Sequence, residues 1–320
     1  MQGRSRWLLV LVLVLVSACS STTFVYNRLD FLLPWYLGDY VELEREQKKY
    51  LDAVLDPFLQ WHRMEELPQY LQLLQDAERK LDNPLTASDI EDLSLSFEAA
   101  WLRLESRALE WLMELGEQLR DQQIEGFVAE LRDKQTEYEE KYLPRTDEEY
   151  HEEAYDNLRD SLQDYMGRLD SEQREMLQAA SHELLRSDGV WLSERAAWID
   201  MLERVLQREP GWQQALRDAI ASRDERVSTA YRDTYAHNTA VIYAVLAQAI
   251  NSRSDKQDRR LRGKIEGFEQ DLETLIAQGR AAQERAAQER AAQERAAQDG
   301  AAQDGAAQDG AAQERAARNI

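Results

Sequence analysis

The stretch TASDIEDLSLSFEAAWLRLESRALEWLMEL, residues 86–115, decides the fold class of this chain. Its large apolar residues follow one another at steps of three and four, a spacing that places them on one face of an α-helix. They are Ile90, Leu93, Phe97, Trp101, Leu104, Ala108, Trp111 and Leu115. Thr86 and Asp89 form a variant of the capping box that opens a helix. The stretch therefore predicts one long amphipathic helix with an apolar face to bury.

The same helical spacing continues on both sides of this stretch, and no convincing strand pattern interrupts it. Three more pairs have the spacing of a capping box or its relatives: Thr146 with Glu149, Asp170 with Gln173, and Ser254 with Gln257. Prolines predict breaks or kinks at Pro57, at Pro68 and at mid-length, at Pro144. The prediction is an all-α protein, a multi-helix bundle of roughly seven to nine helices within residues 24–278. A boundary between two sub-bundles is predicted near residues 143–146.

Residues 279–320 form a different kind of sequence, a low-complexity tail. AAQER occurs three times, AAQDG three times, and AAQER once more between residues 281 and 315. A step of five residues turns about 140° beyond a full helical turn, so the alanines never build one apolar stripe. Without a stripe the tail cannot form a core, and it is predicted to be disordered or weakly helical.

The composition excludes one class of function. The chain has 320 residues, with 39 Lys and Arg against 61 Asp and Glu, for a formal net charge of −22. A nucleic-acid backbone would be repelled, so no nucleic acid is expected as a partner. The chain contains one cysteine, which excludes an internal disulfide framework.

The first 18 residues have the features of a secretory signal peptide. Arg4 and Arg6 precede an unbroken apolar run from Trp7 to Val16. A helix of ten residues spans about 15 Å, half of the roughly 30 Å of bilayer hydrocarbon. The run is followed by Ser17, Ala18 and Cys19. Val16 to Cys19 resembles the lipobox of bacterial lipoproteins, in which the cysteine is acylated and becomes the new N-terminus.

This resemblance implies a cellular location and a lipid anchor. Cys19 would carry a diacylglycerol and an N-acyl chain, and no other cofactor is expected. Residues 19–23 would form the lipidated cysteine and a short tether. Ser20, in place of the Asp that favours inner-membrane retention, implies an outer-membrane lipoprotein whose body faces the periplasm of a Gram-negative bacterium.

Two segments are unusually rich in large residues and supply the candidate binding residues. Residues 24–40 read FVYNRLDFLLPWYLGDY and include Trp35 and Tyr36. They fit either a membrane-interface belt, the zone that Trp and Tyr favour, or the packing of a first helix. The second segment supplies Trp61, His62, Arg63, Glu66 and Tyr70. At helical spacing His62 neighbours Glu66, and Trp61 neighbours Glu65; the His–Glu pair could fix a core register or serve a ligand.

No catalytic motif is present in the sequence. Glu148 and His151 have the Glu-x-x-His spacing of di-iron bundles, but no other histidine has a Glu three residues before it. No metal site is therefore expected, and no catalytic residue is assigned.

The two aromatic segments carry a family likeness. The run from Phe24 to Tyr70, with its WHRMEELPQY stretch, resembles the opening of the DUF6279 family of bacterial lipoproteins, whose function is uncharacterised. The likeness extends from the lipobox to about residue 278 and implies a helical periplasmic body without supplying an activity. A weaker likeness links residues 169–173 and 85–89 to the Leu-Thr-x-x-Gln helix openings of Spy-like periplasmic chaperones. The first departs from that pattern at Thr and the second at Gln.

The sequence favours a membrane-anchored, non-enzymatic helical lipoprotein that binds an envelope protein or a cell-wall component. Two alternatives stay open. One is an envelope hydrolase or metal-dependent enzyme that uses His62, Glu65 and Glu66. The other is a Spy-like periplasmic chaperone or stress protein.

Overall fold

The computed structural model describes residues 21–317 of the chain. The predicted signal peptide, Cys19 and Ser20 lie outside the described residues, so the lipidation of Cys19 stays a prediction.

Helices make up nearly all of the described chain, and no β-strand occurs between residues 21 and 317. In chain order they are α2 (Ser21–Tyr26), α3 (Leu29–Gly38), α4 (Arg45–Trp61), the π-helical turn η1 (His62–Glu66), α5 (Leu67–Lys80), α6 (Ala87–Gln118), α7 (Asp121–Tyr142), α8 (Asp147–Met166), α9 (Ser171–Glu183), α10 (Asp188–Val205), α11 (Trp212–Ala221), α12 (Arg223–Arg226), α13 (Thr229–Asn251) and α14 (Asp255–Ala317). The all-α class is confirmed. The expected number of helices is wrong, because helices as short as α2 and α12 hold too few turns to show a periodic pattern.

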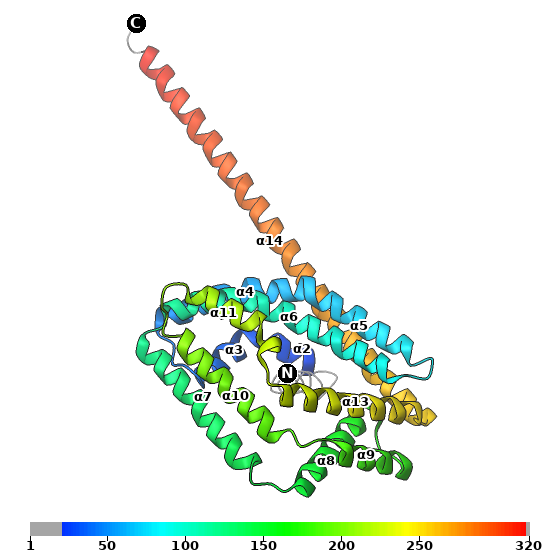
Figure 1. The fold of residues 1–320 in the computed structure, drawn as a ribbon. Coiled ribbons are helices and arrows are strands. Elements are labelled where there is room, and N and C mark those ends of the chain that lie inside the picture. Colours follow the sequence, from blue (N-terminus) through cyan, green and yellow to red (C-terminus); the bar gives the residue numbers. More distant parts are fainter. Residues whose placement is uncertain (1–20, 318–320) are drawn as a thin grey trace.

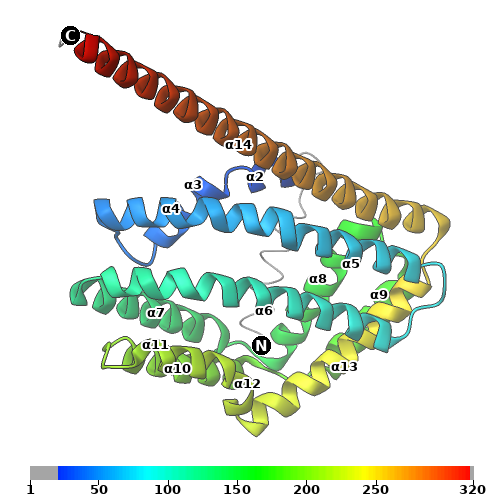
Figure 2. The same cartoon turned by 90° about the horizontal axis from the view of Figure 1, so that it is seen from above.

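Helices that are distant in the sequence lie side by side (Figures 1 and 2). α14 runs along α5, α13 along α6, and α10 along α7. α2 contacts α14, and α3 contacts α4. The first helix of the described chain is thereby joined to its last helix.

The buried apolar side chains form several clusters. The largest joins α8, α9, α13 and α14 around Leu169, Leu177 and Ala249, which are fully buried. Another lies where α2, α5 and α14 meet, and it contains Tyr26, Leu67, Leu275 and Ile276. The break predicted at mid-length is confirmed, since α7 ends at Tyr142 and α8 begins at Asp147.

The two prolines near the start of the chain behave differently. Pro57 lies inside α4, so of the two outcomes expected there, a break or a kink, the break is wrong. Leu51 and Leu55, almost completely buried against α6, hold the helix together across this position. Pro68 does change the helix, because it follows the π-helical turn η1 in the first turn of α5.

The repeat tail continues α14 as a helix that leaves the body (Figure 1). Among residues 255–295, the part of α14 whose burial is described, Gly279 is the last buried position, and residues 280–295 are exposed apart from the partly covered Ala286. Of the two states expected for the tail, the structure has the helical one.

Candidate functional site

The π-helical turn η1 is the local feature around which five of the predicted binding residues gather. In η1 the Leu67 N–H donates to the His62 carbonyl, five residues earlier, where an α-helix would bond four residues back. Pro68 has no N–H, and in an α-helix its ring would collide with the carbonyl of residue 64. The wider π turn relieves that conflict. It also rotates the side chains that follow relative to an unbroken α-helix.

The hydrogen-bond partner of His62 is Tyr26, on α2, the first helix of the described chain, rather than Glu66. The Tyr26 hydroxyl lies 2.9 Å from His62 Nδ1, and the two rings stack with their centroids 5.7 Å apart. The Tyr70 ring packs edge-on against His62 at 5.5 Å. Burial lowers the pKa of His62 to about 4, the charge of Glu66 opposing the shift, and burial raises the pKa of Tyr26 to about 12. Both groups are therefore neutral at pH 7.

Glu66 has a different partner, so the predicted His62–Glu66 pairing is wrong. The Glu66 side chain is 3% exposed and forms a two-pronged ion pair with Arg103 of α6. Arg103 Nε donates to Glu66 Oε1 at 3.0 Å and Arg103 Nη2 to Glu66 Oε2 at 2.8 Å. This geometry suits a buried carboxylate, which needs both charge and hydrogen bonds.

Trp61 lies on the outer side of the same turn. Its Nε1 donates to Glu65 Oε2 at 3.0 Å, which confirms the expected contact between them, and the Arg107 guanidinium lies 5.5 Å from the centroid of its ring. Trp61 is only partly buried. Trp35 and Tyr36 are not part of this group, because they lie on α3 and are 62% and 39% exposed.

Arg63 fastens α2 to α14. Its guanidinium lies 5.1 Å from the Tyr26 ring centroid, and its Nη2 donates to Asn27 Oδ1 at 3.0 Å. Asn27 in turn donates to Gln278 Oε1 of α14 at 3.0 Å. A Cβ on Gly279 would lie 2.8 Å from Arg63 Cδ, so the close contact between η1 and α14 requires glycine there. We call this meeting of α2, η1 and residues 271–279 of α14 the anchor junction.

A second arrangement, which was not predicted from the sequence, joins the N-terminal ends of helices in pairs. Gln47 and Gln123 exchange side-chain hydrogen bonds of 3.1 and 2.9 Å, and Gln173 and Gln257 exchange bonds of 3.3 and 2.8 Å. Each glutamine is the third residue of its helix, and each also accepts a hydrogen bond from the backbone N–H of its own N-cap residue. The N-terminal ends of four helices are therefore joined in two pairs by the same pattern of hydrogen bonds.

The surroundings of the two glutamine pairs match position by position. Gln47 and Gln173 each donate to the residue five positions before their partner, Gln118 and Ser252. Gln123 and Gln257 do the same to Glu42 and Arg168. A five-residue sequence pattern accompanies this arrangement: a leucine, the N-cap residue, any two residues and the glutamine. It is present at residues 43–47, 119–123 and 169–173. The fourth, at residues 253–257, has arginine in place of leucine.

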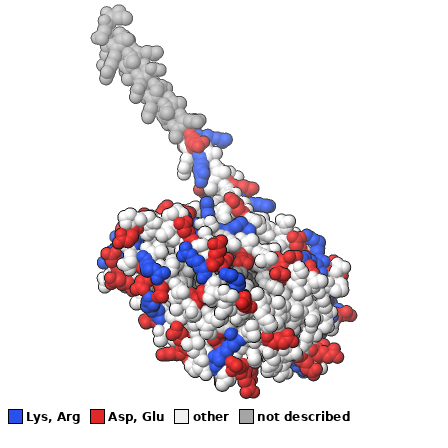
Figure 3. Space-filling view, in the orientation of Figure 1, with Lys and Arg blue, Asp and Glu red and all other residues white. Residues whose placement is uncertain are grey.

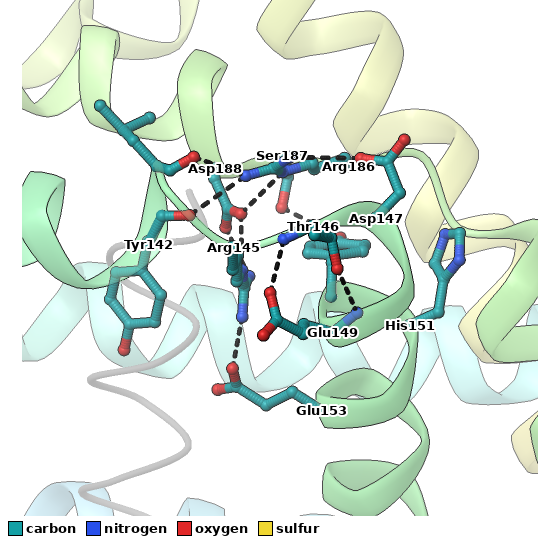
Figure 4. Close-up of polar contacts among 12 residues, drawn as sticks. Tyr142, Arg145, Thr146, Asp147, Glu149, His151, Glu153, Arg186, Ser187 and Asp188 are labelled. Carbon is teal, nitrogen blue, oxygen red and sulfur yellow. Dashed lines mark hydrogen bonds and ion pairs between the residues drawn. The ribbon is translucent and has the colours of Figure 1, made fainter.

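A third polar cluster fixes the corner at mid-length (Figure 4). Asp188, 4% exposed, accepts hydrogen bonds from Arg145 at 2.5 and 2.7 Å and from Arg186 at 3.1 Å. Arg145 also pairs with Glu153 and lies between the rings of Tyr142 and Tyr150. Every charge in this cluster has an opposite neighbour, so the cluster connects the α7–α8 corner to the start of α10 and presents no free charge to a ligand.

The histidine singled out for a metal site has a structural role here. His151 Nε2 lies 3.1 Å from the Leu184 carbonyl, and its ring packs against His182. Within residues 21–317, no group of three His, Cys, Asp or Glu residues is placed to hold a metal ion. One surface hollow of about 330 Å³ lies between α6 and α11. Another, of about 370 Å³, lies along α14 and reaches Asp271 and Thr274 of the anchor junction.

No helix among the described residues is long and apolar enough to cross a membrane.

Comparison with known proteins gives one family and no annotated relative. The model of a family described as a family of unknown function, DUF6279, matches residues 39–232, more than half of the chain. The match includes η1 and the first glutamine pair. It is shorter than the resemblance predicted, because residues 16–38, which include the lipobox, and residues 233–278 lie outside it. No curated protein and no solved structure matches the chain.

Proposed function

We propose, from the premise that this chain belongs to the DUF6279 family, that it is a lipid-anchored, non-enzymatic factor. In this proposal it binds a protein or another envelope component at the periplasmic face of the outer membrane. The observation that supports the proposal most is the anchor junction. Tyr26, seven residues after Cys19, is 4% exposed and packs with Leu67, Leu275 and Ile276. A lipid on Cys19 would thus be connected to the core almost directly and would hold the body close to its membrane.

The anchor is tested with two forms of the chain that differ only in the lipid. One keeps residues 1–19 as they are, and the other is exported behind an ordinary cleavable signal so that it begins at Ser20. We expect the first to incorporate labelled palmitate and to fractionate with outer membranes. We expect the second to be released with the periplasmic fraction. Equal labelling or equal membrane recovery of the two forms would refute the anchor.

The binding function is tested by crosslinking the lipidated chain in cells and identifying the crosslinked components. We expect a defined partner that is lost when the unlipidated form is used. Tightly bound stoichiometric metal, or a hydrolytic activity that His62→Ala abolishes, would instead support the enzyme alternative. That alternative is not favoured, because His62, Glu65 and Glu66 are each engaged, with Tyr26, Trp61 and Arg103 respectively.

A Spy-like chaperone is the second candidate, and two observations favour it. The helix opening that gave the weak likeness, residues 169–173, is one of four related openings that pair through glutamine. In addition, residues 234–251 of α13 contain no charged residue, and an uncharged area lies over α13 in Figure 3. Such a surface suits unfolded chains of varied sequence. We expect the purified chain, if it is a chaperone, to suppress the aggregation of a denatured protein at near-stoichiometric ratio, and a lack of suppression would remove this candidate.

A further inference from the structure

Exposed aromatic side chains are concentrated at one place in the described chain. Phe24, Phe31, Trp35 and Tyr36 are 63%, 66%, 62% and 39% exposed, and the other large apolar residues exposed to this degree are all leucines. We call Phe24, Phe31 and Trp35 the aromatic face. Tyr36 is left out of it, because its hydroxyl hydrogen-bonds to that of Tyr40 and it lies on the side of α3 that carries Leu29 and Leu33. Large exposed aromatic side chains are costly in water and mark surfaces that contact something else.

The geometry of α3 explains why these residues cannot turn inward. Leu29, Leu33 and Leu37, spaced by four, pack against the body in two of its apolar clusters. Phe31 and Trp35, also spaced by four, occupy the opposite side of the helix and are exposed. The body side of α3 is thus already provided with apolar contacts. The outer side, at Phe31 and Trp35, is equally apolar, and both side chains are left mostly exposed.

The position of the aromatic face in the chain indicates what covers it. Phe24 follows Cys19 by five residues. Two residues at full extension and three helical ones reach at most about 12 Å together. The headgroup zone on each side of the hydrocarbon is itself roughly 5–7 Å thick. An acylated Cys19 would therefore hold Phe24 at or within a few ångströms of that zone.

The charges point to the same partner. Residues 21–38 contain Arg28 and Asp30 and no other charged side chain, so this segment is neutral, whereas the whole chain carries −22. An acidic body is repelled by anionic lipid, and the neutral segment is where it can approach a bilayer without that penalty. Phe, Trp and Tyr side chains favour the interface between headgroups and acyl chains.

We propose that the aromatic face inserts into the interfacial region of the lipid bilayer that carries the anchor. This inference rests on the proposed function, since it uses the lipid on Cys19 to bring the face to the membrane. The lipid alone would leave the body free to swivel about its tether. A second contact at Phe31 and Trp35, on a helix packed against α4, fixes which side of the body faces the membrane and which side faces the periplasm.

The test uses the lipidated full chain in phospholipid vesicles that contain lipids brominated near the top of the acyl chains. Bromine quenches only tryptophans that lie in the bilayer. We expect brominated lipid to reduce the emission that Trp35 contributes, obtained as the difference from Trp35→Phe, by about two-fold. Trp191, on α10 and packed against Tyr138 and Tyr142, is the matched control, and its contribution should not change.

The outcomes separate this inference from the proposed function. If the chain floats with the vesicles and Trp35 is not quenched, the anchor stands and the inference is wrong. If the chain does not float at all, the anchor and the inference both fail. An aqueous quencher provides a further check. If Trp35 is protected from this quencher in vesicles without brominated lipid, and is protected to the same degree in a dimer of the chain in detergent, then a second copy covers the face. That result would overturn the inference.

Discussion

His62 couples the anchor junction to pH. Its pKa in the folded chain, about 4, lies below the unfolded value of 6.5 because burial disfavours the imidazolium. As the pH falls, the unfolded chain takes up the proton first, so the stability that neutral His62 supplies is present above about pH 6.5 and lost between 6.5 and 4. We expect this residue to reduce the free energy of unfolding by about 2 kcal/mol between pH 7.5 and pH 5.

The measurement is a set of denaturant melts of the wild type and His62→Gln at those two pH values. The variant has no imidazole at this position, so its stability should fall less than that of the wild type by the same amount. Parallel losses in the two proteins would show that His62 does not titrate in this window.

The Glu66–Arg103 ion pair gives a second prediction at the scale of the residue. Arg103→Met would leave a carboxylate with 3% of its side chain exposed and without its cationic partner. We expect a loss of about 2–4 kcal/mol of stability in thermal or denaturant melts. The double variant Glu66→Leu, Arg103→Met should recover most of that loss, because it removes the unpaired charge.

Arg107→Met is the matched control for Arg103→Met, since Arg107 lies on the same helix and its guanidinium lies against the ring of the partly exposed Trp61, at the end of α4. It should cost about 0.5–1 kcal/mol. Equal effects of the two arginine variants would contradict a special role for the buried pair.

The candidate residues could be found from the sequence, but not their partners. One helical region carries Trp61, His62, Arg63, Glu66 and Tyr70, so their closeness follows from their positions in the sequence. Their partners Tyr26 and Arg103 come from helices 36 and 37 residues away. Helical spacing indicates which residues share a face, and it contains no information on which distant helix meets that face.

Gly279 decides how closely two elements approach, and it gives a prediction at that scale. Gly279→Ala would place a Cβ 2.8 Å from Arg63 Cδ and from Met64 Sδ. We expect it to destabilise the chain by about 1–3 kcal/mol, despite the better helix propensity of alanine. Arg63 cannot simply move aside, since it is bound to Asn27 and packed on Tyr26.

Gly263 provides the control within the same helix. It is exposed, and a Cβ there would meet nothing within 4 Å. Gly263→Ala should therefore stabilise α14 by up to about 1 kcal/mol. If Gly279→Ala stabilised the chain to the same degree in thermal melts, the close contact at the anchor junction would be refuted.

At the scale of the element, boundaries set by local chemistry were predictable. The helix starts at Thr86, Thr146 and Asp170 have the side-chain caps that the sequence predicted. The continuation of α4 through Pro57 was not predictable, because it depends on the packing of Leu51 and Leu55 against another helix. The π-helical turn was not predictable for a related reason. Pro68 indicates that the α-helical hydrogen bonding is interrupted, but it does not indicate that the interruption is a π-helical turn.

The whole molecule divides at Gly279 into a packed body and a projecting helix. None of residues 281–295 is buried. Truncation after Arg280 should therefore leave the thermal midpoint within about two degrees of that of the full chain. Truncation after Gln270 removes Leu272, Leu275 and Ile276 from the cluster that holds Tyr26, and it should lower the midpoint strongly. A large drop for the first truncation would show that the repeats pack on the body.

The fold class, the break at mid-length and the separate character of the tail could all be predicted, because each depends on local periodicity. The pairing of helix starts through Gln47 with Gln123 and Gln173 with Gln257 could not. Its members are more than 70 residues apart, and each glutamine alone looks like an ordinary capping residue. The number of helices was underestimated because short elements such as α12 depend on tertiary contacts rather than on a repeated pattern.

The projecting part of α14 makes the reach of this protein adjustable in fixed steps. Each AAQER or AAQDG unit adds five residues, about 7.5 Å of helix. Gaining or losing one unit by slippage in a repetitive gene would lengthen or shorten the rod by that increment and rotate its tip by about 140°, without altering a buried residue of the body. The length of the projecting helix therefore depends on the number of units, while the packed end of α14 keeps its structure.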